Sequence, residues 1–138
     1  MKVNQISVFL ENKNGRLAEV SRVLSQGGIN LRAVSIADTA DFGILRIIAD
    51  KPDEALAILS DNGFTARETN VIGVVVQDTP GGLNEILDLF EETGVNIEYL
   101  YSSLAGKDKK AVVIFKVEDI DYGLKILSDH GKETKVVF

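Results

Sequence analysis

One stretch of this chain occurs twice, and the repetition constrains the fold more than any other feature. Residues 11–17 read Glu-Asn-Lys-Asn-Gly-Arg-Leu, and residues 77–83 read Gln-Asp-Thr-Pro-Gly-Gly-Leu. Each stretch follows an apolar segment and opens an amphipathic one. Residues 28–30 (Gly-Ile-Asn) and 94–96 (Gly-Val-Asn) then follow at the same spacing. Self-similarity at a fixed period indicates that one supersecondary unit is used twice.

Each repeat is predicted to run strand, helix, strand, strand, helix, short strand. Alternating apolar residues predict strands, and apolar residues every three or four positions predict helices. The predicted strands cover 3–10, 31–36, 44–49, 65–68, 71–76, 97–104, 111–117 and 135–138, and the predicted helices centre on 17–24, 55–59, 83–90 and 122–129. A βαββαβ order predicts an α+β, ferredoxin-like fold for each repeat.

The boundary between the repeats is predicted near residue 70, so that residues 1–69 form the first domain and residues 70–138 the second. Modules of this size bury a modest share of their surface and are marginally stable alone. We therefore expect the two copies to form an intrachain pseudo-dimer.

The link between the repeats is no longer than two or three residues, which favours either a tight hairpin or one continuous strand. A hairpin at Thr69-Asn70 would place the last strand of the first repeat beside Val71–Val76. That position otherwise belongs to Lys135–Phe138. The hypothesis is a strand exchange between repeats, and pairing of Lys135–Phe138 with Val71–Val76 would contradict it.

Composition excludes several classes of function. The 138 residues are 45% apolar and 26% charged, with a net charge of −6, which disfavours phosphate backbones as partners. No apolar run is long enough to span a bilayer, and no signal-peptide pattern opens the chain, so we expect a cytoplasmic protein. One histidine and no cysteine leave no catalytic triad, thiol nucleophile or clustered metal ligands. We therefore expect no enzyme activity, no metal and no cofactor.

The repeated pattern resembles the ACT domain, a small-molecule regulatory module. The pattern consists of a strand, Asp/Asn-x-x-Gly-x-Leu, a helix, Gly-Ile/Val-Asn and a second strand, and it covers both repeats. Residues 11–17 are also similar to the opening of acetolactate-synthase regulatory subunits, although that likeness fades in the second half. The resemblance implies that a free amino acid binds at the interface of two ACT units, against the loop before the first helix.

Carried onto this chain, the resemblance implies two sets of ligand contacts. They are Asn12, Gly15, Leu17 and Asn30 in the first repeat, and Asp78, Gly81, Leu83 and Asn96 in the second. The predicted ligand-binding set also includes the neighbouring residues Arg16, Leu31, Gly82 and Ile97. Free N–H groups and the dipole at a helix start suit a carboxylate, and a glycine lets the ligand approach the backbone. Asn or Asp side chains could hold an ammonium group.

The two sets differ, which argues against equal sites. The second repeat has the acid Asp78 where the first has Asn12, and Gly82 where the first has Arg16. Arg16 could pair with a ligand carboxylate, but a pair with Glu19 is the preferred expectation. The glycines could serve the turns alone, and the asparagines could satisfy backbone groups where a strand starts.

The function predicted from these features is a non-catalytic amino-acid sensor that acts allosterically on a separate partner through a population shift. One alternative is a regulatory subunit that docks to an amino-acid biosynthetic enzyme such as acetolactate synthase. Another is a purely structural interaction module. No nucleic acid or membrane partner is expected, and a homodimer stays open. The acidic balance, with Asp38, Asp41, Asp78 and Glu98, favours a ligand with a cationic or polar side chain.

Overall fold

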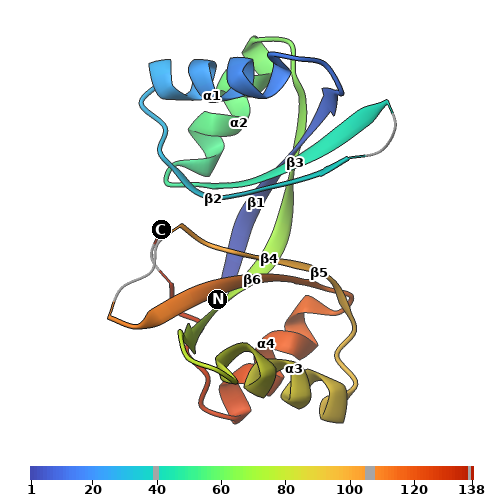
Figure 1. Cartoon of the computed structure of the whole chain (residues 1–138), viewed down its shortest axis with the longest axis vertical. Helices are drawn as coiled ribbons and strands as arrows, with labels where there is room; N and C mark the ends of the chain where they lie inside the picture. The colour runs from blue at the N-terminus through green and yellow to red at the C-terminus, as the bar shows by residue number, and fades with distance from the viewer. Residues whose placement is uncertain (39–40, 105–107, 137) are drawn as a thin grey trace. The chain divides into compact units, whose positions relative to one another are not determined.

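The computed structural model describes residues 1–38, 41–104, 108–136 and 138. In chain order the elements are β1 (Lys2–Glu11), α1 (Arg16–Gln26), β2 (Leu31–Asp38), β3 (Phe42–Ala49), α2 (Pro52–Asp61), β4 (Thr65–Gln77), α3 (Gly82–Thr93), β5 (Ile97–Ser102), β6 (Lys110–Val117) and α4 (Ile120–Asp129) (Figure 1). The chain divides into two compact units. The first unit is Asn4–Thr69 with Phe138, and the second is Asn70–Val137 with Met1–Val3.

The first unit places its strands in the order β2-β3-β1-β4, and β3 pairs antiparallel with both β1 and β2. Both helices lie on one face of these strands (Figure 1). The buried face of α1 contributes Val20 and Leu24, and α2 contributes Ala55 and Leu59. These side chains form one core with alternate residues of β1 and β3, as the period of two in each strand requires.

The second unit repeats this arrangement with β4, β6 and β5 in that order and with antiparallel pairing of β6 to both neighbours. Its core joins α3 and α4 to alternate residues of β4 and β6. Phe90 of α3 meets Phe115 of β6 edge to face, with ring centroids 5.4 Å apart. The predicted ferredoxin-like class is confirmed for both units, and the intrachain pseudo-dimer stays a prediction.

The junction between the repeats is one continuous strand, β4, which is the second of the two predicted arrangements, and the alternative of a hairpin at Thr69-Asn70 is wrong. A two-residue hairpin needs backbone with φ > 0, which Asn-Gly supplies and Thr-Asn followed by Val71 does not. The strand-exchange hypothesis required that hairpin and is therefore also wrong.

The C-terminal segment does not close the sheet as predicted, because residues 132–136 and 138 lie in no strand. Instead, the Val75 N–H donates to the Glu133 carbonyl at 2.9 Å. Residues 1–3 belong to this unit, where Lys2 Nζ lies 3.1 Å from Asp121 Oδ1 of α4. The second unit is therefore completed in part by the N-terminus of the chain.

Two predicted hairpin tips include residues 39–40 and 105–107, which lie outside the described residues. Within the part of the chain that the structure describes, no helix is long and apolar enough to cross a membrane.

Candidate functional site

Two equivalent turns carry most of the predicted ligand residues. We call Glu11–Leu17 the first corner and Gln77–Leu83 the second corner. Gly15 and Gly81 each precede the first residue of a helix with φ of 89°, a left-handed conformation that favours glycine. The Gly15 carbonyl accepts from the Glu19 N–H at 3.0 Å, and the Gly81 carbonyl accepts from the Glu85 N–H at 3.0 Å. The two corners therefore share one backbone frame.

A glycine at the N-cap position leaves the start of each helix without a side-chain cap from that residue. The first N–H groups of a helix have no partner within the helix itself. Together with the helix dipole, they form a site that favours a negatively charged group. At both corners the N–H of the first helical residue already donates to the loop, from Arg16 to the Lys13 carbonyl at 3.4 Å and from Gly82 to the Thr79 carbonyl at 3.0 Å. Anion binding at the two corners stays a prediction.

The first corner borders a cavity of about 160 Å³. It is lined by Leu10, Glu11, Asn12, Lys13, Arg16, Leu17, Ile36 and Gly43. Three of these residues, Asn12, Arg16 and Leu17, belong to the predicted ligand set. Drug-sized ligands occupy pockets of about 300 Å³ or more, so this cavity suits a smaller molecule such as a metabolite.

Ile36 and Gly43 are lining residues that sequence reasoning did not identify. Gly43 reaches the corner because it pairs with Leu10 at the end of β1, and Ile36 because it lies on the neighbouring strand β2. Both contributions depend on strand register, which no local motif in the sequence specifies.

Arg16 lies on the wall of this cavity and is held by two contacts. Its Nη1 donates to Glu19 Oε2 at 2.8 Å, as predicted, and its Cζ lies 5.0 Å from the centroid of the Phe64 ring. The second contact is a cation–π interaction. The Arg16 Nε is inaccessible to solvent and has no hydrogen-bond partner among the described residues. The side chain is thus a half-buried cation with one unsatisfied donor.

Glu11 provides the negative charge of the first corner. Its Oε2 lies 2.9 Å from Lys13 Nζ. The hydrogen bond from Lys13, followed by the positive charge of Lys13, lowers the pKa of Glu11 below its ordinary value of 4.5. Glu11 is therefore ionised at neutral pH and can accept a hydrogen bond from an ammonium group.

Asn30 and Asn96 lie where β2 and β5 start, and neither lines a described cavity at a corner. The Asn30 N–H donates to Asp50 Oδ1 at 2.9 Å, and Asn96 Nδ2 donates to Glu118 Oε2 at 3.3 Å. These contacts agree with the structural alternative, in which the asparagines order the strand start. The neighbouring Leu31 and Ile97 pack against the cores of their own units.

Within its own unit, Asn30 is therefore not brought to the first corner. Leu31 pairs with Ala49, whereas Ile36 pairs with Leu45, so the start of β2 and the cavity lie toward opposite ends of this strand. The same holds in the second unit, where Ile97 pairs with Val117 and the second corner adjoins the Gln77–Lys110 pair.

The second corner borders a different cavity, of about 270 Å³. Gln77 and Gly82 line it from the corner, and Glu85, Lys110, Lys132 and Glu133 add charged side chains. A Cβ atom on Gly82 would lie 2.0 Å from the Gln77 carbonyl oxygen, so this position admits only glycine without a shift of the backbone. Asp78, Gly81 and Leu83 are not among the described residues that line this cavity.

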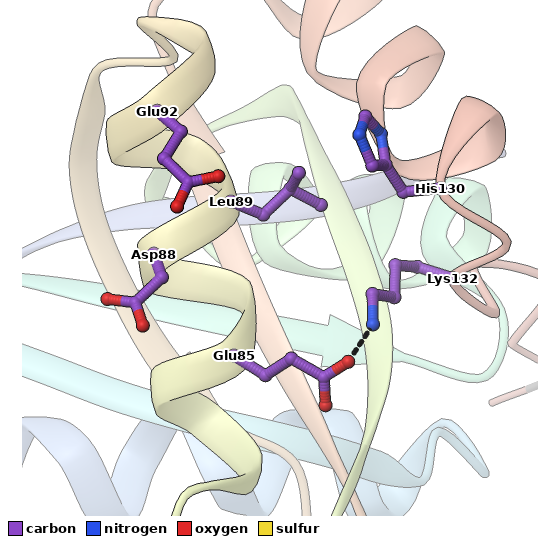
Figure 2. A pocket seen from close by; sticks show the side chains of 6 residues that line it. All are labelled: Glu85, Asp88, Leu89, Glu92, His130 and Lys132. Carbon is purple, nitrogen blue, oxygen red and sulfur yellow. Dashed lines mark hydrogen bonds and ion pairs between the residues drawn. The ribbon is translucent and has the colours of Figure 1, made fainter.

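A third cavity, of about 290 Å³, is lined by residues of α3 and of the segment that follows α4. Figure 2 shows three carboxylates on this helix (Glu85, Asp88 and Glu92), with Lys132 extending toward Glu85 and forming an ion pair with it. His130 Nδ1 lies 2.8 Å from the Ile126 carbonyl oxygen of its own helix. Among the described residues, no group of three His, Asp or Glu side chains is placed to hold a metal ion.

Comparison with protein families identifies the repeat. The family model for the ACT domain pair matches residues 1–130. The chain belongs to the ACT domain pair family. The resemblance noted from the two corner motifs is thereby confirmed.

This ACT domain pair is similar to several solved structures. Protein BT0572 from Bacteroides thetaiotaomicron is 41% identical, with 96% of this chain and 91% of that chain covered and a TM-score of 0.90. The regulatory subunit of aspartate kinase from Thermus thermophilus, in its ligand-free form, is 20% identical over 91% of each chain, with a TM-score of 0.64. The corresponding subunit from Thermus flavus is 17% identical over 91% of this chain and 90% of that chain, with a TM-score of 0.60. The last two show the shared fold. Comparison with curated proteins gives no match.

Proposed function

We propose that this ACT domain pair is a non-catalytic sensor of a free amino acid and that the ligand binds at the first corner. The observation that carries the proposal is the cavity that collects Asn12, Arg16 and Leu17 at the start of α1. There the ligand carboxylate would meet the first N–H groups of the helix and the guanidinium of Arg16. The ammonium group would meet the ionised Glu11, with the Asn12 amide beside it.

The response to the ligand follows from population shift. A ligand changes the conformation of a protein only through its different affinity for two states. Arg16 provides one such difference, because a bound carboxylate competes with Glu19 for the same guanidinium. The partner that we propose is an enzyme of amino-acid metabolism, as in the aspartate kinase regulatory subunits that share the fold.

A thermal-shift screen against the twenty amino acids tests the proposal. A ligand present at about 100 times its Kd stabilises the folded state by about 2.7 kcal/mol. At least one amino acid is expected to raise Tm, and calorimetry on the folded protein then gives its Kd. A flat response to all twenty would contradict the proposed function.

A matched pair of variants locates the site. Arg16→Gln removes the guanidinium from the cavity wall, whereas Arg22→Gln removes an exposed guanidinium from the same helix. We expect the first variant to lose most of the affinity and the second to retain it. Equal affinities of the two variants would place the ligand elsewhere.

A further inference from the structure

The cavity at the first corner has an apolar side that the proposed function does not by itself require. Leu10, Leu17 and Ile36 line it from β1, α1 and β2. Leu10 is buried, but Leu17 is 45% exposed and Ile36 is 51% exposed. Single exposed apolar side chains are common on proteins. Here two of them face one cavity from different elements, next to a third that is buried.

Among the described residues that line this cavity, the charged ones come from the loop and the start of α1. Glu11 pairs with Lys13, and Arg16 pairs with Glu19. From the described part of strands β2 and β3, Ile36 and Gly43 line the cavity. A ligand with charged groups at one end and an apolar group at the other therefore matches the distribution of polarity.

A second charge at the far end of the ligand would meet no opposite charge among the described residues that line the cavity there. A carboxylate or an ammonium group placed against Ile36 and Gly43 would lose its hydration without an opposite charge to replace it, and this is costly. Acidic and basic amino acids are disfavoured for this reason.

We infer that the first corner binds an α-amino acid with an uncharged aliphatic side chain of about the size of leucine, and that Ile36 and Gly43 set this preference. The inference rests on the proposed function and names the ligand class of the same site. It replaces the cationic or polar side chain that the acidic composition favours. Asp78 and Glu98 belong to the other unit, Asp41 is not among the described residues that line this cavity, and the side chain of Asp38 lies outside the described part of the chain.

Gly43 limits the size of the apolar end. A Cβ atom on Gly43 would lie 3.4 Å from Ile36 Cδ1 and 3.6 Å from Ile36 Cγ1, which is ordinary van der Waals contact. Gly43→Ala is therefore compatible with the fold. Its methyl group would take up space beside Ile36 that the ligand side chain needs.

Calorimetric titration with defined probes tests the inference. The probes are L-leucine, L-alanine, L-lysine, L-aspartate and L-leucinamide, which lacks the carboxylate. Wild-type protein is expected to bind L-leucine most tightly and L-leucinamide at least about tenfold more weakly. A few methylene groups in an apolar pocket change affinity by about tenfold or more, so L-alanine should also be weaker.

Two variants on one strand provide the matched control. Ile36→Ser and Val34→Ser each remove an exposed aliphatic side chain from β2, but only Ile36 lines the cavity. Ile36→Ser and Gly43→Ala are expected to weaken the affinity for L-leucine by about tenfold and to leave the affinity for L-alanine unchanged. Val34→Ser is expected to bind as wild type does.

The outcomes separate the two proposals. Tighter binding of L-lysine, L-aspartate or L-alanine than of L-leucine would overturn the inference and leave the proposed function intact. Equal effects of Ile36→Ser and Val34→Ser would also overturn it. Failure of every amino acid to bind would overturn the proposed function and the inference together.

Discussion

The two corners have the same backbone and different walls. Phe64 follows Gly63 after α2, and Lys132 follows Gly131 after α4, each with its N–H donating to a leucine carbonyl of the preceding helix at 2.9 Å. In the first unit, Phe64 is buried and supports Arg16. In the second unit the equivalent positions hold Lys132 and Gly82, and a cavity of about 270 Å³ lies there instead.

The negative charge at one helical position, which is equivalent in the two units, is balanced in two different ways. Glu19 and Glu85 both follow the left-handed glycine by four residues and bond to its carbonyl. Glu19 pairs with Arg16 of its own helix, whereas Glu85 pairs with Lys132 from the segment after α4. The ion pair of this glutamate thus lies within α1 in the first unit, whereas in the second unit it joins α3 to the segment after α4 beside a polar cavity.

The strand side of the corners differs as well. Leu10 pairs with Gly43 in the first unit, and Val76 pairs with Ala111 in the second. Ile36 pairs with Leu45, and its equivalent Ser102 pairs with Val113. Among the described residues, the cavity at the second corner lacks the apolar lining of the first, which is why we propose one ligand site.

The largest expected effect on stability comes from replacing Gly82, a glycine that the first corner lacks. Gly82→Ala places a Cβ atom 2.0 Å from the Gln77 carbonyl oxygen, and we expect a loss of about 3 kcal/mol of unfolding free energy. Arg16→Ala at the equivalent position should cost about 1 kcal/mol, through the lost ion pair and ring contact. Urea unfolding measures both. Equal losses of unfolding free energy in the two variants would contradict the proposed difference in packing between the two corners.

The next largest effect on stability comes from replacing Gly15 or Gly81, the left-handed glycines that the two corners share. Gly15→Ala and Gly81→Ala each force an L-residue to φ of 89°, with nothing within 4 Å of the new Cβ atom. We expect each to cost about 1–2 kcal/mol, because only the left-handed conformation opposes the substitution. The same urea experiment measures these losses. A clear difference between the two variants would show that the frames are not equivalent.

A smaller effect concerns the ion pair of the second unit. Lys132→Gln removes the partner of Glu85, whose side chain is 65% exposed, and we expect a loss of less than about 1 kcal/mol. Salt should reduce this loss further, since the pair is partly solvated. Thermal unfolding at low and high ionic strength measures it. A loss that does not change with salt would assign Lys132 a packing role like that of Phe64.

The smallest effect is the pH response of Glu11, a residue that Gln77 replaces at the second corner. The pKa of Glu11 is lowered in the folded state by the hydrogen bond from Lys13 and by its charge. Its contribution to stability is therefore present above the unfolded pKa and is lost as pH falls through the folded pKa. Glu11→Gln should reduce the fall in Tm on acidification below about pH 4.5.

Glu68 provides the opposite control for this pH response. Desolvation, followed by the hydrogen bond and negative charge of Asp53, raises the pKa of Glu68 above 4.5. Its contribution is present below the unfolded pKa and is lost as pH rises through the folded pKa. Glu68→Gln should therefore raise Tm at pH 7 relative to wild type, with no such gain at pH 3.5. If Glu11→Gln also raised Tm at pH 7 relative to wild type, the opposite directions of the two pKa shifts would be contradicted.

Local patterns in the sequence were sufficient for the fold and for part of the site. Alternating apolar residues, amphipathic helices and the left-handed glycines Gly15 and Gly81 act within a few residues of chain, so their consequences can be read directly. The Arg16–Glu19 pair was predictable for the same reason, since the two residues lie one helical turn apart.

The amino-acid sequence by itself determined that two ferredoxin-like units each carry an uncapped helix start behind a left-handed glycine. The tertiary structure alone decided what surrounds each start. Strand register brings Ile36 and Gly43 to the first corner, and helix packing places Phe64 under Arg16 but Lys132 beside Glu85. These neighbours are distant along the chain, and only the packing of strands and helices brings them together.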